Sequence, residues 1–157
     1  MTIRLALVRH AKSDWGDPDL DDHDRPLNER GLRDAPVMAR RLSQSGFRAD
    51  TLLSSTARRA VTTADFFSGA LGVPVQQQEQ LYGASGSQLL RAAAESRGRS
   101  VVVVAHDPGM SELAGRLSRH GVEHMPTCAV AVFRWEEDDW DVATQVDPIT
   151  WKFDAPE

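Results

Sequence analysis

The sequence LALVRHAKS, residues 5–13, places a basic cluster directly after an apolar run. Residues 3–8 are apolar except for Arg4 and rich in β-forming side chains, which predicts a buried strand. Arg9 and His10 follow at its carboxyl end. In open α/β sheets ligands bind at this edge, because strands deliver side chains and helix N-termini deliver free N–H groups to it. The cluster therefore suits an oxyanion, with phosphate the best fit; an ordinary polar loop after a first strand is the alternative.

Two further stretches show the same succession of apolar strand and polar group. Residues 51–55 (TLLSS) lead into TARRA, and residues 101–105 (VVVVA) lead into HDPG. In a parallel sheet the three strand ends meet at one edge, which would gather His10, His106 and one arginine of the pair 58–59. This set suits phosphoryl transfer through a covalent phosphohistidine. A neutral imidazole attacks phosphorus, guanidinium groups neutralise the oxygens, and a second histidine donates to the transition state.

At these motifs the chain resembles the histidine phosphatase (phosphoglycerate mutase-like) superfamily and, more closely, the SixA-type phosphohistidine phosphatases. The resemblance rests on four motifs in order, with PTCA at residues 126–129 a weaker match beyond them. The motifs are LVRHAKSDW at 7–15, DRPLNERG at 24–31, SSTARRAVTTA at 54–64 and AHDPG at 105–109.

The resemblance implies the roles of the central residues. His10 would be the phosphorylated nucleophile, Arg9 and Arg59 would bind phosphate, and His106 would be the second histidine. Arg59 fits better than Arg58, because the family pattern is Arg-Ala-x-x-Thr-Ala and only Arg59 is followed by AVTTA. The expected activity is that of a phosphatase acting on phosphohistidine in a protein, with no metal and no cofactor.

Ser13 and Arg25 are further candidates for substrate binding, since both lie within the matching motifs. Residues 14–24, rich in aspartate, predict a solvated loop; a calcium site is disfavoured because the EF-hand's central Gly and terminal Glu are absent at loop spacing. For Arg25, a plain surface ion pair with this acidic loop is the alternative.

The identity of any proton donor is open. Much of the superfamily has a carboxylate that protonates the leaving oxygen, and Gly83 stands in the corresponding region. An imidazole that is already protonated can leave neutral, so the absence favours phosphohistidine over phosphate esters as substrate. Two alternatives remain: a phosphatase of small phosphate esters with Asp107 as the acid, and a non-catalytic phosphate-binding module. A plain role for Asp107 is to cap the helix expected to begin near Pro108.

The expected fold is α/β: a single three-layer domain over residues 1–157, with a mostly parallel sheet, helices on both faces and an antiparallel edge near the C-terminus. A chain of 157 residues suits one such core. No long insertion separates residues 54 and 101, so we expect no cap and an open pocket.

The net charge and the apolar runs of the sequence limit the kinds of partner that we expect for the chain. A net charge of −5 disfavours nucleic acid and anionic membrane surfaces. No apolar run is long enough to span a bilayer, and residues 1–4 lead straight into a strand without the pattern of a signal peptide, so a cytoplasmic protein is expected. The single cysteine, Cys128, excludes an internal disulfide.

Two local predictions can be tested directly. A helix is expected between Asn28 and Gly46, with Pro36 either kinking it or marking a first turn near Asp34. A second helix is expected to extend to Leu71 with Ser55 or Thr56 as its cap.

A hairpin is expected to pair residues 128–134 with residues 140–146 across an acidic turn. The first strand contains a Cys-x5-Arg spacing, Cys128 to Arg134, like that of cysteine-dependent phosphatases. We interpret it as chance, because an extended strand holds the two residues about 20 Å apart.

Overall fold

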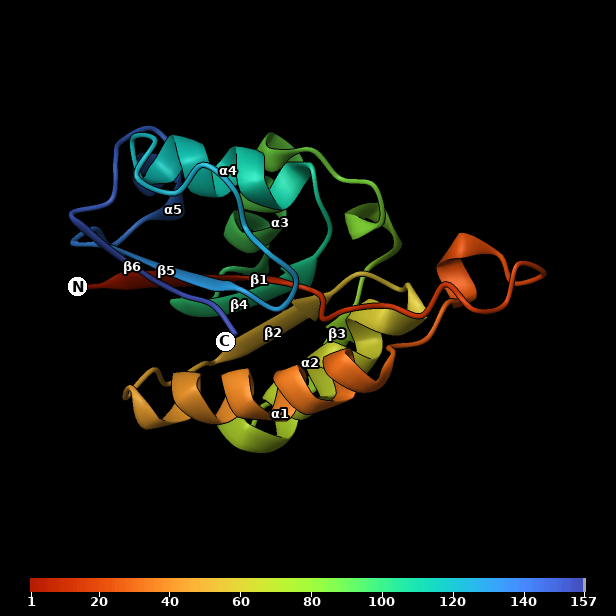
Figure 1. The fold of residues 1–157 in the computed structure, drawn as a ribbon. Coiled ribbons are helices and arrows are strands. Elements are labelled where there is room, and N and C mark those ends of the chain that lie inside the picture. The colour runs from red at the N-terminus through yellow and green to blue at the C-terminus, as the bar shows by residue number, and fades with distance from the viewer. Residues whose placement is uncertain (157) are drawn as a thin grey trace.

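The computed structural model describes residues 1–156, and its middle layer is a six-stranded sheet (Figure 1). The strand order is β3-β2-β4-β1-β5-β6. β1 to β4 are mutually parallel, and β5 runs antiparallel to β1 and β6. This confirms the mostly parallel sheet with antiparallel pairing near the C-terminus. The strands are β1 Ile3–Arg9, β2 Thr51–Ser54, β3 Val75–Gln77, β4 Ser100–Ala105, β5 Val130–Trp135 and β6 Thr150–Asp154.

Helices cover both faces of the sheet, as expected. Figure 1 shows α1 (Glu29–Gln44) and α2 (Arg58–Leu71) below it, and α3 (Gly86–Ser96), α4 (Gly109–Leu117) and α5 (Trp140–Ala143) above. Two short 3-10 helices, η1 (Asp22–Asp24) and η2 (Glu79–Leu81), lie in connections. None of the helices in residues 1–156 combines the length and apolar character needed to cross a bilayer.

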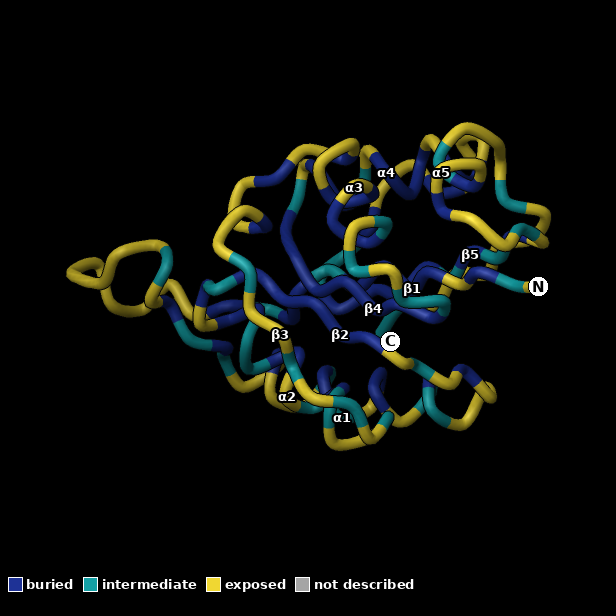
Figure 2. The backbone as a smooth tube through the Cα atoms, turned by 180° about the vertical axis from the view of Figure 1, so that it is seen from behind, coloured by how far each residue is buried: buried dark blue, intermediate teal, exposed yellow. Residues whose placement is uncertain are grey.

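Each face of the sheet carries its own hydrophobic core. Leu5 and Leu7 of β1 pack into the core beneath α3 and α4, while Ala6 and Val8 pack into the core against α1 and α2. A strand buried on both faces is apolar throughout, which is why residues 3–8 show no polar alternation. The tube in Figure 2 is accordingly dark blue through the inner strands of the sheet, and yellow on most of the surrounding loops and on much of the edge strand β3.

The strand register places the polar motifs that follow β1 and β4 at the same edge of the sheet. Arg9 of β1 pairs with Ala105 of β4, so the next residues, His10 and His106, leave the sheet side by side. The His10 amide continues the ladder by donating to the Ala105 carbonyl at 3.0 Å, and the Ser55 amide donates to the Val104 carbonyl at 3.0 Å.

Pro36 does not mark the start of a helix, so that part of the prediction was wrong. α1 begins at Glu29, and Asn28 Oδ1 accepts a hydrogen bond from the Gly31 amide. The cap and a continuous buried face outweigh the one backbone hydrogen bond that proline removes. The buried residues of that face are Gly31, Ala35, Met38, Ala39 and Leu42.

The predicted hairpin was also wrong in its second strand. Residues 140–143 form the helix α5, where the Asp139 side chain accepts from the Asp141 amide, and β6 pairs with β5 instead. Trp140 is buried and donates its indole N–H to the Gly98 carbonyl at 2.6 Å. Burial of this indole outweighs the weak β pattern of residues 140–146.

Candidate active site

Two histidines and one arginine meet at the carboxyl ends of β1, β2 and β4. The ring centroids of His10 and His106 lie 5.0 Å apart. Arg59, in the first turn of α2, lies between them, with Nε 3.4 Å from His10 Nε2 and Nη2 3.5 Å from His106 Nδ1. All three residues are buried, whereas Arg58 is exposed. The structure thus brings together the residues that the motifs single out.

His10 is held as a neutral imidazole with one free ring nitrogen. Its Nδ1 lies 2.7 Å from the Ala11 carbonyl, which can only accept, so Nδ1 carries the proton and the lone pair is on Nε2. Burial lowers the pKa of His10 to about 4, with the nearby Arg59 and Arg9 charges adding to the effect against the Ala11 hydrogen bond. At neutral pH, Nε2 is therefore available as a nucleophile.

His106 has the opposite arrangement. Its Nε2 lies 2.7 Å from Ser55 Oγ, and its Nδ1 faces the Arg59 guanidinium, which can only donate. Nε2 therefore carries the proton and Nδ1 faces the site. Burial, followed by His10 and Arg59, lowers the pKa of His106 to about 3.

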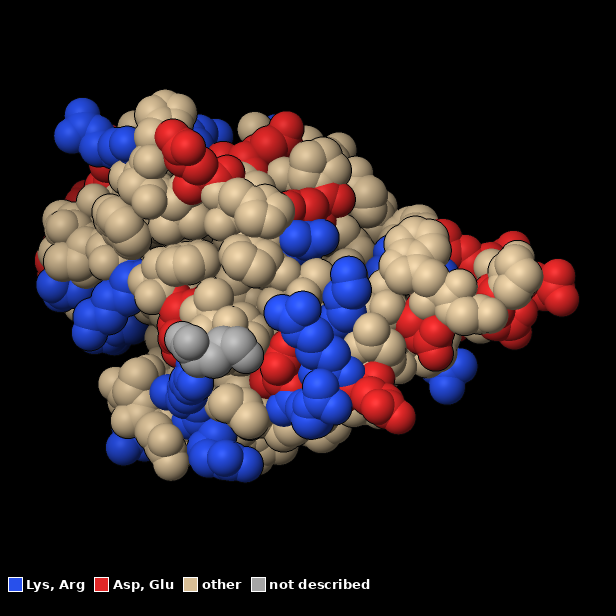
Figure 3. Space-filling model, in the orientation of Figure 1, with Lys and Arg blue, Asp and Glu red and all other residues tan. Residues whose placement is uncertain are grey.

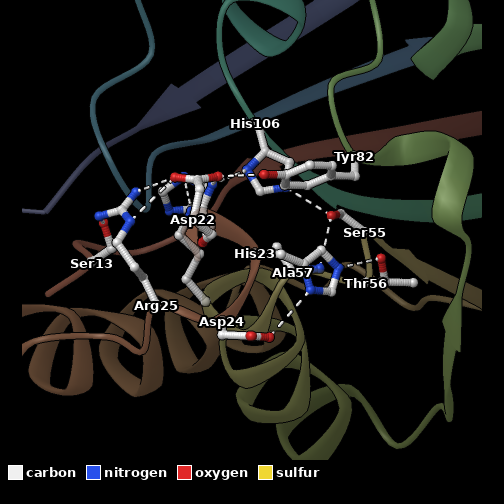
Figure 4. Close-up of polar contacts among 12 residues, drawn as sticks. Ser13, Asp22, His23, Asp24, Arg25, Ser55, Thr56, Ala57, Tyr82 and His106 are labelled. Carbon is white, nitrogen blue, oxygen red and sulfur yellow. Dashed lines mark hydrogen bonds and ion pairs between the residues drawn. The ribbon is translucent and has the colours of Figure 1, made fainter. Parts of the chain in front are cut away.

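Ser55 does not cap α2 as expected. The N-cap is Ala57, without a side-chain hydrogen bond, and Thr56 Oγ1 lies 2.8 Å from His23 Nε2. Ser55 Oγ instead serves His106 and accepts from the Ala57 amide at 3.2 Å. The hydroxyls expected to start the helix thus position histidines (Figure 4).

Arg9 and Asp107 form a pair beside the histidines. Arg9 Nη1 donates to the Met125 carbonyl at 2.8 Å and lies 3.5 Å from Asp107 Oδ2. Both Asp107 oxygens accept from Ser111, through its amide at 2.9 Å and its hydroxyl at 2.8 Å. Asp107 therefore holds the first turn of α4.

Ser13 and Arg25 contact one another directly. Arg25 Nη1 donates to Ser13 Oγ at 2.8 Å, and both side chains are buried. The Arg25 guanidinium also lies 3.3 Å from the ring centroid of the exposed Trp15. Arg25 does pair with the acidic loop, but as a buried group and not as a surface ion pair.

Asp22 is the residue whose place in the site the sequence did not reveal. Its Oδ1 accepts from Arg25 Nη2 at 2.9 Å, and its Oδ2 accepts from Arg59 Nη2 at 2.9 Å and from the Tyr82 hydroxyl. These hydrogen bonds, led by that of Tyr82, hold the pKa of Asp22 well below its usual range. Figure 4 shows the carboxylate between Arg25 and Tyr82, beside His106.

The sequence carried a weak signal for one of these residues. Asp22 stands three positions before Arg25, a spacing that allows an ion pair across one turn. Tyr82 had no such signal. Its ring packs edge-on against His106 at 5.4 Å, next to Gly83, which adopts a left-handed φ of 75°.

Cys128 and Arg134 lie toward opposite ends of β1. The Cys128 amide donates to the carbonyls of Arg9 and His10, both at 3.0 Å, whereas Arg134 is the register partner of Arg4. Cys128 is fully buried in the turn before β5, not half-buried in a strand, and burial raises the pKa of its thiol to about 12. The thiol is therefore protonated at neutral pH.

Comparisons with known proteins find a family and relatives that match much of the chain. The family model of the histidine phosphatase superfamily (branch 1) matches residues 5–87, a little more than half of the chain. An uncharacterized protein of Mycobacterium tuberculosis, Rv1276c, is 32% identical over 139 residues, covering 81% of this chain and 86% of that protein.

Solved structures share the fold along nearly the whole chain. One assigned as the phosphohistidine phosphatase SixA from Agrobacterium tumefaciens is 29% identical with a TM-score of 0.83, covering 98% of both chains. A mycobacterial glucosyl-3-phosphoglycerate phosphatase is 18% identical with a TM-score of 0.67, covering 98% of both chains.

Proposed function

The chain belongs to the histidine phosphatase superfamily, whose fold and relatives support phosphatase activity, and we propose that it dephosphorylates phosphohistidine on a protein through a covalent intermediate on His10. The observation that carries this proposal is the state of His10. Its Nδ1 proton is held by the Ala11 carbonyl while Nε2 keeps a free lone pair next to Arg59.

In the first step, His10 Nε2 attacks phosphorus. The new P–N bond forms as the bond to the substrate imidazole breaks, and that imidazole leaves neutral if its other nitrogen already carries a proton. The Ala11 carbonyl stabilises the positive charge that develops on the His10 ring. Arg9, Arg25 and Arg59 supply positive charge for the phosphoryl oxygens.

In the second step, water attacks the phosphorus of phospho-His10. The P–N bond breaks, its electron pair returns to Nε2, and the proton lost by water goes to the departing phosphate. His106 serves both steps through Nδ1. A phosphoryl dianion against this nitrogen favours its protonation, so that it donates a hydrogen bond to an equatorial oxygen while Ser55 holds the other side of the ring.

The surroundings of the leaving group support phosphohistidine as the substrate. Gly83 brings no carboxylate, and Asp107 is engaged by Ser111 and Arg9. The hydrogen bonds of Asp22 lower the pKa of its carboxyl group, which is therefore ionised and holds no proton to donate. A site without a dedicated acid suits an imidazole better than an alkoxide, whose conjugate acid is far weaker.

The direct test compares turnover on a histidine-phosphorylated protein with turnover on a panel of phosphate esters. We expect faster turnover of phosphohistidine and an acid-labile, base-stable label on His10. Faster turnover of alkyl phosphates would identify small phosphate esters, and not phosphohistidine, as the substrate class. Binding of phosphate without turnover of any substrate would indicate a phosphate-binding module.

A further inference from the structure

The Asp22 carboxylate is surrounded by hydrogen-bond donors of the candidate active site. Four donor groups meet its oxygens: Arg25 through Nε and Nη2, Arg59 Nη2 and the Tyr82 hydroxyl. Guanidinium groups bind carboxylates and phosphates by the same paired N–H geometry. The donors that hold Asp22 are therefore equally suited to the oxygens of a phosphoryl group.

The arginines are fixed, while the carboxylate is held on an exposed segment. The side chains of Arg25 and Arg59 are 8% and 7% exposed, whereas that of Asp22 is 49% exposed. None of residues 14–24 is buried, and the segment projects from the body of the protein in Figures 1 and 2. A segment with so few buried contacts opens at a lower cost than the helix and sheet that hold the arginines.

Each nitrogen of Arg59 already donates a hydrogen bond in this arrangement. Nη1 donates to the Asp22 carbonyl at 2.6 Å, Nη2 to its carboxylate, and Nε to His10 Nε2. If the proposed reaction at His10 is correct, Arg59 can clamp the phosphoryl group with its terminal nitrogens only after Asp22 releases them.

Charge balance leads to the same conclusion. The guanidiniums of Arg9, Arg25 and Arg59 face the carboxylates of Asp22 and Asp107, which leaves one positive charge while both histidines are neutral. A phosphoryl dianion that replaces Asp22 brings the group to neutrality. One that joins Asp22 leaves a net negative charge in a largely buried site unless His106 takes up a proton, and burial opposes that protonation.

We propose that the phosphoryl group of the substrate displaces the Asp22 carboxylate and takes over its donors, which makes Tyr82 a substrate-binding residue. This inference rests on the proposed function and deepens it. Tyr82 suits the role because its hydrogen bond to Asp22 raises the pKa of the phenol, so the hydroxyl is a donor at neutral pH.

The test uses tungstate and perrhenate, two tetrahedral oxyanions that differ by one negative charge, with affinities measured by calorimetry. Asp22→Asn removes the competing charge, so both ions should bind about tenfold more tightly, and by the same factor, because the cost of displacing Asp22 is common to both. Asp24→Asn is the matched control. Asp24 lies in the same 3-10 helix, and its carboxylate pairs with His23 at 3.6 Å and not with Arg25, Arg59 or Tyr82, so both affinities should stay as in the wild type.

Tyr82→Phe tests the second half of the proposal. In the wild type the substitution weakens the hold on both Asp22 and tungstate, so the net change in affinity should be small. In the Asp22→Ala background, which has no side-chain acceptor at this position, only the anion loses a donor, and tungstate should bind about fivefold more weakly. This dependence on background is not expected of a tyrosine that only packs against His106.

Other outcomes would overturn the proposal. If Asp22 stays in place, its removal would help tungstate far more than perrhenate, because repulsion scales with the ligand's charge. If Asp22 only positions Arg59, Asp22→Asn would weaken both ions. Asp22→Ala must tighten binding as Asp22→Asn does. If only Asp22→Asn tightened binding, the new amide group and not the loss of the carboxylate would be the cause. The proposed function is tested separately by the label on His10, which these equilibrium measurements do not need.

Discussion

Arg59 Nε donates a hydrogen bond at 3.4 Å to His10 Nε2, the unprotonated nitrogen of that ring. The contact aims a fixed positive charge at the atom expected to bond to phosphorus, and it keeps the imidazole neutral by opposing protonation. One guanidinium therefore prepares the nucleophile and stands ready for the oxygens that arrive with phosphorus.

His10→Ala is expected to reduce turnover to less than about a hundredth of the wild-type rate, because the nucleophile is gone. Vanadate binding should be largely kept, since the three arginines remain. Turnover and radiolabel transfer on the two proteins provide the measurement. Substantial residual turnover would mean that another group attacks phosphorus.

Ser55→Ala leaves the His106 Nε2 proton without its acceptor, and we expect kcat to fall about tenfold. Ser54→Ala is a matched control, because Ser54 is equally buried but donates to the Ser55 carbonyl and does not contact either histidine. Equal losses of kcat in the two variants would assign the effect to general destabilisation.

The pKa of His10 is lowered to about 4 and that of His106 to about 3, so both rings bind protons more readily in the unfolded chain, where the pKa is near 6.5. The stability contributed by keeping them neutral is present above pH 6.5 and is lost as the pH falls toward 4 and 3. The loss is about 3 kcal/mol for His10 and about 5 kcal/mol for His106. Urea unfolding across this range should show it, and His10→Ala should make the pH dependence shallower.

If guanidiniums and histidines alone neutralise the phosphoryl group, EDTA should leave the rate unchanged. The rate on phosphate esters should rise steeply as the pKa of the leaving group falls, so p-nitrophenyl phosphate should outpace alkyl phosphates. A flat dependence that becomes steep in Asp107→Asn would identify Asp107 as an acid and favour ester substrates.

Cys128→Ser is expected to leave kcat nearly unchanged, because the thiol is protonated and Arg134 is remote from it. The new hydroxyl would be buried in an apolar turn and should lower the free energy of unfolding by about 1–2 kcal/mol. Inactivation without loss of stability would contradict this interpretation.

The meeting of the parallel strand ends could be predicted from the sequence. Apolar runs ending at His10 and His106 indicated a parallel sheet whose edge unites them, and the register between Arg9 and Ala105 gives that result. The position of Arg59 followed from its place in the family motif.

The parts that depend on side-chain contacts between distant segments could not. Asp22 belongs to a stretch whose acidic composition indicated solvent, as the red side chains on the projecting segment in Figure 3 illustrate, and yet it binds two buried arginines. Tyr82 reaches it from 60 residues away in sequence. Likewise, α5 stands where a strand was expected. Its buried Trp140 donates to the Gly98 carbonyl, which is remote in the sequence.

The two halves of the site are attached to the protein by different means. The amides of His10 and Ser55 extend the hydrogen-bond ladder of the sheet, whereas Asp22 is held through its contacts with Arg25, Arg59 and Tyr82. Amide protons of His10 and Ser55 should therefore exchange with deuterium only when the whole domain unfolds, while those of residues 14–21 should exchange early. A chain built in this way can alter the projecting segment, through insertions or substitutions, without loosening the nucleophile.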